Sequence, residues 1–79
     1  MHRIKELLDI YHAEYTIKDN TFYLRDYGDV WGVIEVDENF AYFYYSNSMC
    51  KVSLNDALLG KYVDKYLLGF DDFVEFVEG

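Results

Sequence analysis

The sequence predicts an α+β fold in which an N-terminal helix precedes a four-stranded antiparallel meander sheet and two C-terminal helices (αββββαα). Three observations lead to this prediction. Apolar residues recur with helical spacing near both ends of the chain, they alternate with polar residues in the middle, and short polar turns separate the alternating segments. A chain of 79 residues is the size of one domain, so we assign residues 1–79 to a single acidic domain.

The first predicted helix covers about residues 2–13. Its apolar side chains follow the spacing i, i+3, i+4 and i+7, which places them along one face of an amphipathic helix. These residues are Ile4, Leu7, Leu8 and Tyr11.

A period of two follows and predicts the sheet. The four expected strands lie around Tyr15–Ile17, Phe22–Leu24, Val30–Val36 and Phe40–Tyr45. Polar turn candidates separate them: Asp19-Asn20, the segment 26–29 and the segment 37–39. Gly32 interrupts the third strand, which indicates a bulge or a close contact. Residues 49–52 are a candidate for a further short edge strand.

The two remaining helices are expected at about residues 54–68 and 71–78. Ser53 is a good N-cap for the first of them, with Asp56 three residues later as a partial capping box. Gly69 fits the C′ position that ends such a helix. In the last helix Phe73, Val74 and Val77 lie on one side.

The composition excludes several functional classes. Fifteen acidic residues against seven basic ones give a net charge of −8, which disfavours direct binding to nucleic acid or to an anionic membrane. Cys50 is the only cysteine, which fits a reducing compartment and excludes a multi-cysteine zinc site. No apolar segment is as long as the hydrophobic part of a signal peptide or as a membrane-spanning helix. We therefore expect a soluble, cytoplasmic protein.

No group of residues predicts catalysis or a bound cofactor. Cys50 with His2 or His12 is the available thiol–imidazole combination, but a free cysteine is more commonly a small apolar residue. The two histidines are ten residues apart, so they lack the i, i+4 spacing of a shared metal site.

Four carboxylates around the third strand offer the strongest case for a divalent metal. They are Asp26, Asp29, Glu35 and Asp37. Two of them lie at each end of the strand, and a solvated outer face explains them without a metal. We therefore expect a protein that is not an enzyme and that has no catalytic residue, metal or cofactor.

The acidic residues form two candidate partner-binding surfaces. In a meander the first and third turns share one end of the sheet, which places Asp19 beside Asp37 and Glu38. The second surface is a stripe on the last helix, made of Asp71, Asp72, Glu75 and Glu78. Carboxylates at such positions lie ~6 Å apart, a spacing comparable with that of DNA phosphates. The alternative is a solvated polar face, in which the helix dipole favours the first two of these acids but not the last.

The aromatic residues suggest a second mode of binding. Phe40, Tyr42 and Tyr44 share one face of the fourth strand, whereas Phe43 and Tyr45 share the other. If helices cover only one face of the sheet, some large aromatic residues are exposed. The candidates are Tyr23, Trp31, Phe43 and Tyr45. Such residues are typical interface anchors, in a homodimer or in a small immunity or regulatory protein. If helices cover both faces, they are core residues.

The segment Glu14-Tyr15-Thr16-Ile17-Lys18 and an acidic last helix with Asp71, Asp72 and Glu75 resemble the DNA-mimicking type II-A anti-CRISPR proteins, which are small acidic inhibitors encoded by phages. The order of helix, antiparallel sheet and two closing helices is also similar. Lys61, Lys65 and an extra strand depart from that pattern. The resemblance implies an inhibitor in the host cytoplasm that blocks the DNA-reading site of an RNA-guided nuclease, a basic nucleic-acid-binding partner.

Overall fold

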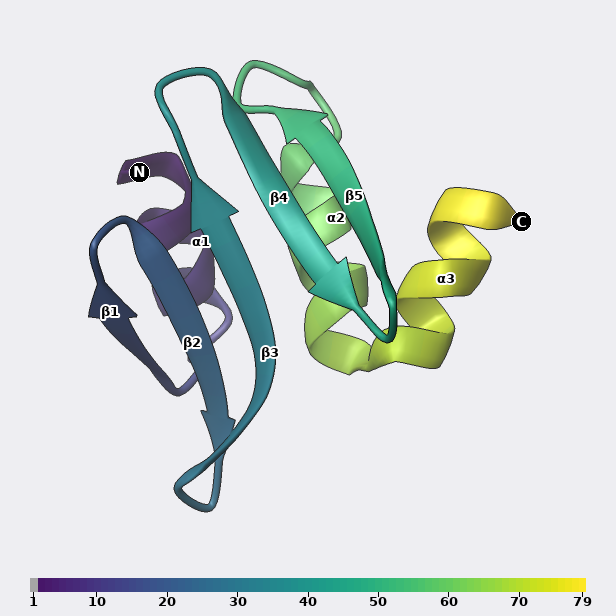
Figure 1. Ribbon diagram of the computed structural model, residues 1–79. Helices are drawn as coiled ribbons and strands as arrows, with labels where there is room; N and C mark the ends of the chain where they lie inside the picture. The colour runs from purple at the N-terminus through teal and green to yellow at the C-terminus, as the bar shows by residue number, and fades with distance from the viewer. Residues whose placement is uncertain (1) are drawn as a thin grey trace.

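The computed structural model describes residues 2–79, which form one antiparallel sheet with helices against one of its faces (Figure 1). The strand order is β1-β2-β3-β4-β5, so each strand pairs with the next one along the chain. The helices are α1 (His2–Ile10), α2 (Leu59–Leu68) and α3 (Phe70–Glu78). The strands are β1 (Tyr15–Lys18), β2 (Thr21–Asp26), β3 (Asp29–Val36), β4 (Phe40–Tyr45) and β5 (Ser48–Ser53). The predicted α+β class and meander are therefore confirmed.

The prediction of four strands is wrong, because the described chain has five. β5 pairs with β4 along its whole length, from Phe40 opposite Ser53 to Tyr45 opposite Ser48. Ser46, with a φ of 50°, and Asn47 form a two-residue hairpin turn that returns the chain beside β4.

Two other hairpins are as tight as the sequence predicted. Asp19 and Asn20 have φ angles of 50° and 64°, and Tyr27 and Gly28 have φ angles of 51° and 87°. Positive φ at both central residues is the mark of a type I′ turn, whose twist matches that of the flanking strands. The backbone of these turns therefore places Asp19 at one end of the sheet and Asp26 and Asp29 at the other.

α1 ends at Ile10, three residues earlier than predicted. His12 adopts a left-handed conformation with a φ of 58°, and its N–H donates to the carbonyl of Asp9 at 3.1 Å. The N–H of Ala13 donates to the carbonyl of Leu8 at 2.9 Å. This Schellman arrangement terminates the helix and turns the chain into β1.

α2 begins at Leu59 rather than at residue 54, because two polar side chains bond to the local backbone instead. The hydroxyl of Ser53 accepts from the N–H of Asn55 at 3.1 Å, and the carboxylate of Asp56 accepts from the N–H of Leu58 at 2.8 Å. Such side-chain bonds offer the backbone an alternative to the helical ladder. The residues predicted to cap a long helix therefore form two successive turns.

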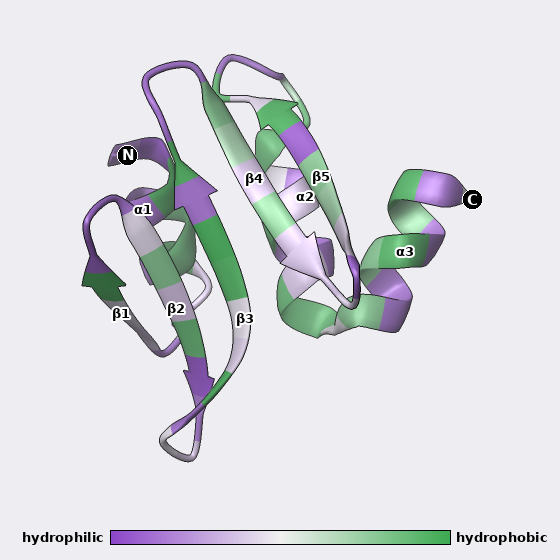
Figure 2. Ribbon diagram, viewed as in Figure 1, coloured by the Kyte–Doolittle hydropathy of each residue, from purple (hydrophilic) through white to green (hydrophobic). Residues whose placement is uncertain are grey.

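The helices cover one face of the sheet and leave the other face open. Buried strand residues such as Phe22, Ile34 and Phe43 alternate with more accessible ones. Figure 2 shows the corresponding alternation of hydropathy along β2. Residues from all three helices complete the core: Ile4, Leu8, Leu59, Val63, Tyr66 and Phe73. Phe43 and Tyr45 are buried, and Trp31 is half-buried. Among the predicted exposed aromatics, Tyr23 is thus the one that lies on the open face, where it is partly accessible.

Tyr66 of α2 connects the helical layer to the backbone of the sheet. Its hydroxyl accepts from the N–H of Val33 at 3.0 Å and donates to the carbonyl of Tyr44, with the carbonyl of Val33 as a second acceptor at 3.2 Å. Val33 and Tyr44 form the last residue pair of the β3–β4 ladder, at the end near the β4–β5 turn. A Cβ on Gly32 would lie 2.9 Å from this hydroxyl, so the close contact predicted at Gly32 is made by Tyr66. Burial raises the pKa of Tyr66 to about 12, which keeps the hydroxyl protonated.

Four aromatic rings pack around Tyr66, two from the sheet and two from α3. The ring centroid of Tyr66 lies 5.3 Å from Phe43, 5.1 Å from Phe73, 5.5 Å from Trp31 and 5.7 Å from Phe70. These distances are in the range of favourable aromatic pairs, each worth about 0.5–1.5 kcal/mol beyond area burial. The cluster fixes α3 against the sheet, because Phe70 and Phe73 belong to α3.

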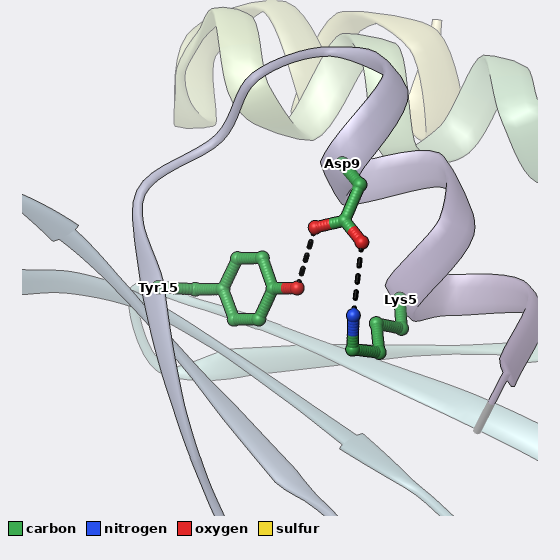
Figure 3. Close-up of polar contacts among 3 residues, drawn as sticks. All are labelled: Lys5, Asp9 and Tyr15. Atoms are coloured by element: carbon green, nitrogen blue, oxygen red, sulfur yellow. Dashed lines mark hydrogen bonds and ion pairs between the residues drawn. The ribbon is translucent and has the colours of Figure 1, made fainter.

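A smaller polar contact joins α1 to β1 (Figure 3). The carboxylate of Asp9 accepts from the hydroxyl of Tyr15 at 2.6 Å and pairs with the ammonium of Lys5 at 3.0 Å. These two donors lower the pKa of Asp9, with Tyr15 the larger cause. Asp9 therefore helps to hold α1 in place and is less available to a partner.

We expect Tyr66→Phe to lower the free energy of unfolding by about 1–3 kcal/mol, because the N–H of Val33 and the carbonyl of Tyr44 lose a buried partner. Urea unfolding followed by circular dichroism measures the change. Tyr62→Phe is the matched control, since the Tyr62 hydroxyl makes no hydrogen bond within residues 2–79. Equal stability of the two variants would show that the ring alone matters.

Candidate functional site

The predicted acidic stripe of Asp71, Asp72, Glu75 and Glu78 lies on the solvent side of α3. All four residues are exposed, whereas Phe73 of the same helix is fully buried. Asp71 and Asp72 occupy the first turn, where the helix dipole stabilises negative charge. Glu78 is in the last turn, where the dipole opposes it, and the hydroxyl of Tyr45 lies 3.5 Å from its carboxylate. The structure thus places these four carboxylates on one helix surface.

A cation lies beside this stripe. Lys65 of α2 lines a shallow hollow of about 350 Å³ together with Asp72, Glu75 and Phe76. No ion pair within residues 2–79 joins Lys65 to either carboxylate, because the one pair found there is Lys5–Asp9. The stripe therefore keeps free carboxylates, but its charge is partly offset on the α2 side.

The other predicted surface lies at the end of the sheet where two turns meet. Asp19 and Asp37 line one hollow of about 360 Å³, and the N–H of Val36 donates to the carbonyl of Asn20 at 2.9 Å. This backbone bond fixes the first turn against the end of β3. Glu38 is exposed in the neighbouring turn. The structure brings Asp19 and Asp37 together as the meander predicted.

Asp37 has a structural role in the β3–β4 turn that the sequence did not predict. One carboxylate oxygen accepts from the N–H groups of Asn39 and Phe40, both at 2.8 Å, and the other accepts from the hydroxyl of Tyr42 at 2.7 Å. These donors lower the pKa of Asp37, with the Tyr42 hydroxyl the largest cause. Because both oxygens are engaged, Asp37 organises the turn and can accept fewer hydrogen bonds from a partner than Asp19, whose carboxylate has no hydrogen bond within residues 2–79. An Asp two residues before Asn is a turn signal in sequence, but the contribution of Tyr42 depends on the strand register.

Glu35 makes a similar pair on the open face of the sheet. The hydroxyl of Tyr44 donates to its carboxylate at 2.8 Å, which raises the pKa of Tyr44. Glu35 and Asp37 were candidates for a metal site, and each accepts a tyrosine hydroxyl instead. Asp26 and Asp29 face one another across the β2–β3 hairpin. Within residues 2–79 no group of three or more His, Cys, Asp or Glu side chains is arranged to hold a metal ion.

The candidate nucleophile has no activating surroundings in the described chain. Cys50 is half-buried in β5, and its burial raises the pKa of the thiol. A raised pKa favours the thiol over the reactive thiolate. His2 and His12 are both exposed.

No protein-family model, curated protein or solved structure matches this chain. The described part of the chain contains no helix of the length and apolarity needed to cross a bilayer.

We expect Tyr42→Phe to raise the pKa of Asp37 toward its ordinary value of 3.8, because the largest stabilising donor is lost. A folded-state pKa below the unfolded value stabilises the fold above that unfolded value, and the contribution is lost as the pH falls through the folded pKa. The variant should therefore lose less stability on acidification below about pH 4. Carboxyl-carbon NMR titration and urea unfolding at several pH values measure both effects.

Tyr44→Phe is the matched control, since Tyr44 donates to Glu35 and not to Asp37. An unchanged Asp37 titration in Tyr42→Phe, or an equal shift in both variants, would contradict the assignment.

Proposed function

We propose that this protein is a non-enzymatic inhibitor that binds a basic, nucleic-acid-binding protein through its acidic surface. The observation that carries the proposal is the α3 stripe, where four exposed carboxylates follow one face of a helix whose other face is fixed in the aromatic core. A rigid row of negative charge fits a groove that normally receives a phosphate backbone, and complementary charge accelerates the encounter.

The sheet end with Asp19 and Glu38 is the second part of this proposed surface. The resemblance to DNA-mimicking anti-CRISPR proteins makes an RNA-guided, CRISPR-associated nuclease the first partner to test. In that setting the protein is a phage-encoded anti-defence protein acting in the host cytoplasm. The protein replaces nucleic acid at the partner's surface and does not itself bind nucleic acid.

We expect Asp72→Asn/Glu75→Gln to weaken binding to an RNA-guided nuclease by about tenfold, because two free carboxylates leave the stripe. Immobilised protein and biolayer interferometry at several salt concentrations provide the measurement. Binding should weaken with salt in the unsubstituted protein and do so less steeply in the variant.

The control variant Glu6→Gln/Asp29→Asn removes the same charge from exposed positions on α1 and β3. Asp19→Asn/Glu38→Gln tests the sheet end separately. Binding that ignores salt, or an equal loss in the control, would refute charge mimicry. Displacement of bound DNA from the nuclease distinguishes inhibition from simple binding.

A second candidate function is supported by the open face of the sheet. Tyr23, Tyr42 and Tyr44 lie there, and the strand charges on this face are mixed rather than acidic. They include Lys18 at the β1 edge, Glu35 in the centre and Lys51, whose ammonium lies 4.0 Å from the centroid of the Phe40 ring. Two copies of the chain can meet through such a face without opposing their acidic surfaces.

If the protein is a homodimer of this kind, Tyr44→Ala should shift it to the monomer, because this ring is exposed on the open face between β3 and β5. Sedimentation velocity over a range of concentrations measures the change. Tyr27→Ala is the control, since Tyr27 is 96% exposed on a hairpin turn and packs against little. A monomer at all concentrations would exclude this function.

A further inference from the structure

A hollow of about 430 Å³ lies at the end of the sheet opposite to Asp19 and Asp37. Three segments meet there: the loop after α1, the β2–β3 hairpin, and the junction of α2 with α3. Tyr11, Trp31 and Gly69 are among the residues that line it, one from each segment. Gly69 is followed two residues later by Asp71, so the hollow adjoins the beginning of the acidic stripe.

Trp31 provides a fixed aromatic wall. Leu24 pairs with Gly32 and Arg25 pairs with Val30, so Trp31 is the extra residue of a β-bulge between them. A bulge redirects a side chain, and here it turns the indole toward the helices. The ring packs against Tyr66 and Phe70 at centroid distances of 5.5 and 6.0 Å, and its remaining accessible part lines the hollow. The indole is thus held in place by the same cluster that anchors α3.

The charges around this wall favour a cationic ligand. Glu14 and Asp26 line the hollow, both are exposed, and no hydrogen bond or ion pair within residues 2–79 engages either carboxylate. Arg25 also lines it, but its guanidinium donates to the hydroxyl of Thr16 at 3.1 Å and to the carbonyl of Gly28 at 2.7 Å. These bonds to neutral acceptors hold Arg25 on the hairpin but leave its positive charge in place. Two free carboxylates and one guanidinium therefore line the hollow, and its net charge is negative.

We propose that this hollow receives an arginine or lysine side chain of the protein partner, with the cationic group against Trp31 and between Glu14 and Asp26. An indole face attracts a desolvated cation, and flanking carboxylates add charge-assisted hydrogen bonds. The identity of the ligand as a partner side chain rests on the proposed function. The cation selectivity of the hollow does not, because it follows from these residues alone. The hollow adds an anchoring pocket to a surface that otherwise consists of exposed charge.

Trp31 is the only tryptophan of the chain, so its fluorescence reports on this hollow directly. The unsubstituted protein is titrated at constant ionic strength with the peptide Gly-Gly-Arg-Gly-Gly. The same peptide with citrulline in place of arginine retains the shape without the charge, and a glutamate version reverses the charge. We expect a saturable change in fluorescence with arginine and a response about tenfold weaker or absent with the other two.

Glu14→Gln/Asp26→Asn should abolish the preference for arginine over citrulline. Glu6→Gln/Asp64→Asn should retain it, because neither residue lines the hollow. Circular dichroism checks that both variants are folded. An equal response to arginine and citrulline, a preference for glutamate, or no response to arginine would each overturn the proposal. Failure here leaves the salt-dependent binding through the α3 stripe unaffected, because that measurement uses Asp72 and Glu75. A negative result for one of the two proposals therefore does not contradict the other.

Discussion

The hydroxyl of Tyr66 meets the backbone of β3 and β4 at the point where their ladder ends, and much of the fold depends on this contact. It requires Gly32, because a larger residue would occupy the space of the hydroxyl. It also fixes α2 relative to the sheet, and the rings of Phe43, Phe73 and Phe70 then position α3. A chain of this size has a thin stability margin, so this aromatic cluster takes the place of a larger core.

Placing all helices on one face has a consequence for the acidic residues. On the open face the hydroxyls of Tyr42 and Tyr44 donate to the carboxylates of Asp37 and Glu35. Asp9 is similarly occupied by Lys5 and Tyr15. The net charge of −8 is therefore not a uniform surface property. Part of it holds turns, helices and tyrosine hydroxyls in place, and the freely available part concentrates on α3, on the turn with Glu38 and around the Trp31 hollow.

The meander itself was predictable, because alternating apolar residues and turn-forming pairs such as Asp19-Asn20 are local signals. The boundaries were less so. The early end of α1 depends on His12 in a left-handed conformation, a role for which glycine is the usual signal. The late start of α2 depends on Ser53 and Asp56, whose side chains support either a capped helix or two turns. The fifth strand was not counted in the predicted sheet, because the polar residues after Tyr45 also fit a loop. In the structure they form the tight turn of a hairpin.

By itself the sequence determined the α+β class, the meander and the placement of four carboxylates on one helix, because periodicity and turn chemistry act over a few residues. It also determined which strand residues share a face. Only the tertiary structure decided which face the helices cover, and hence that Phe43 and Tyr45 are core residues while Tyr42 and Tyr44 are not. The hydrogen bonds that make Asp37 a turn-organising residue, and the hollow beside Trp31, also arise only in the tertiary structure. Both join groups from separate segments, and such contacts exist only after the strands pair and the helices pack.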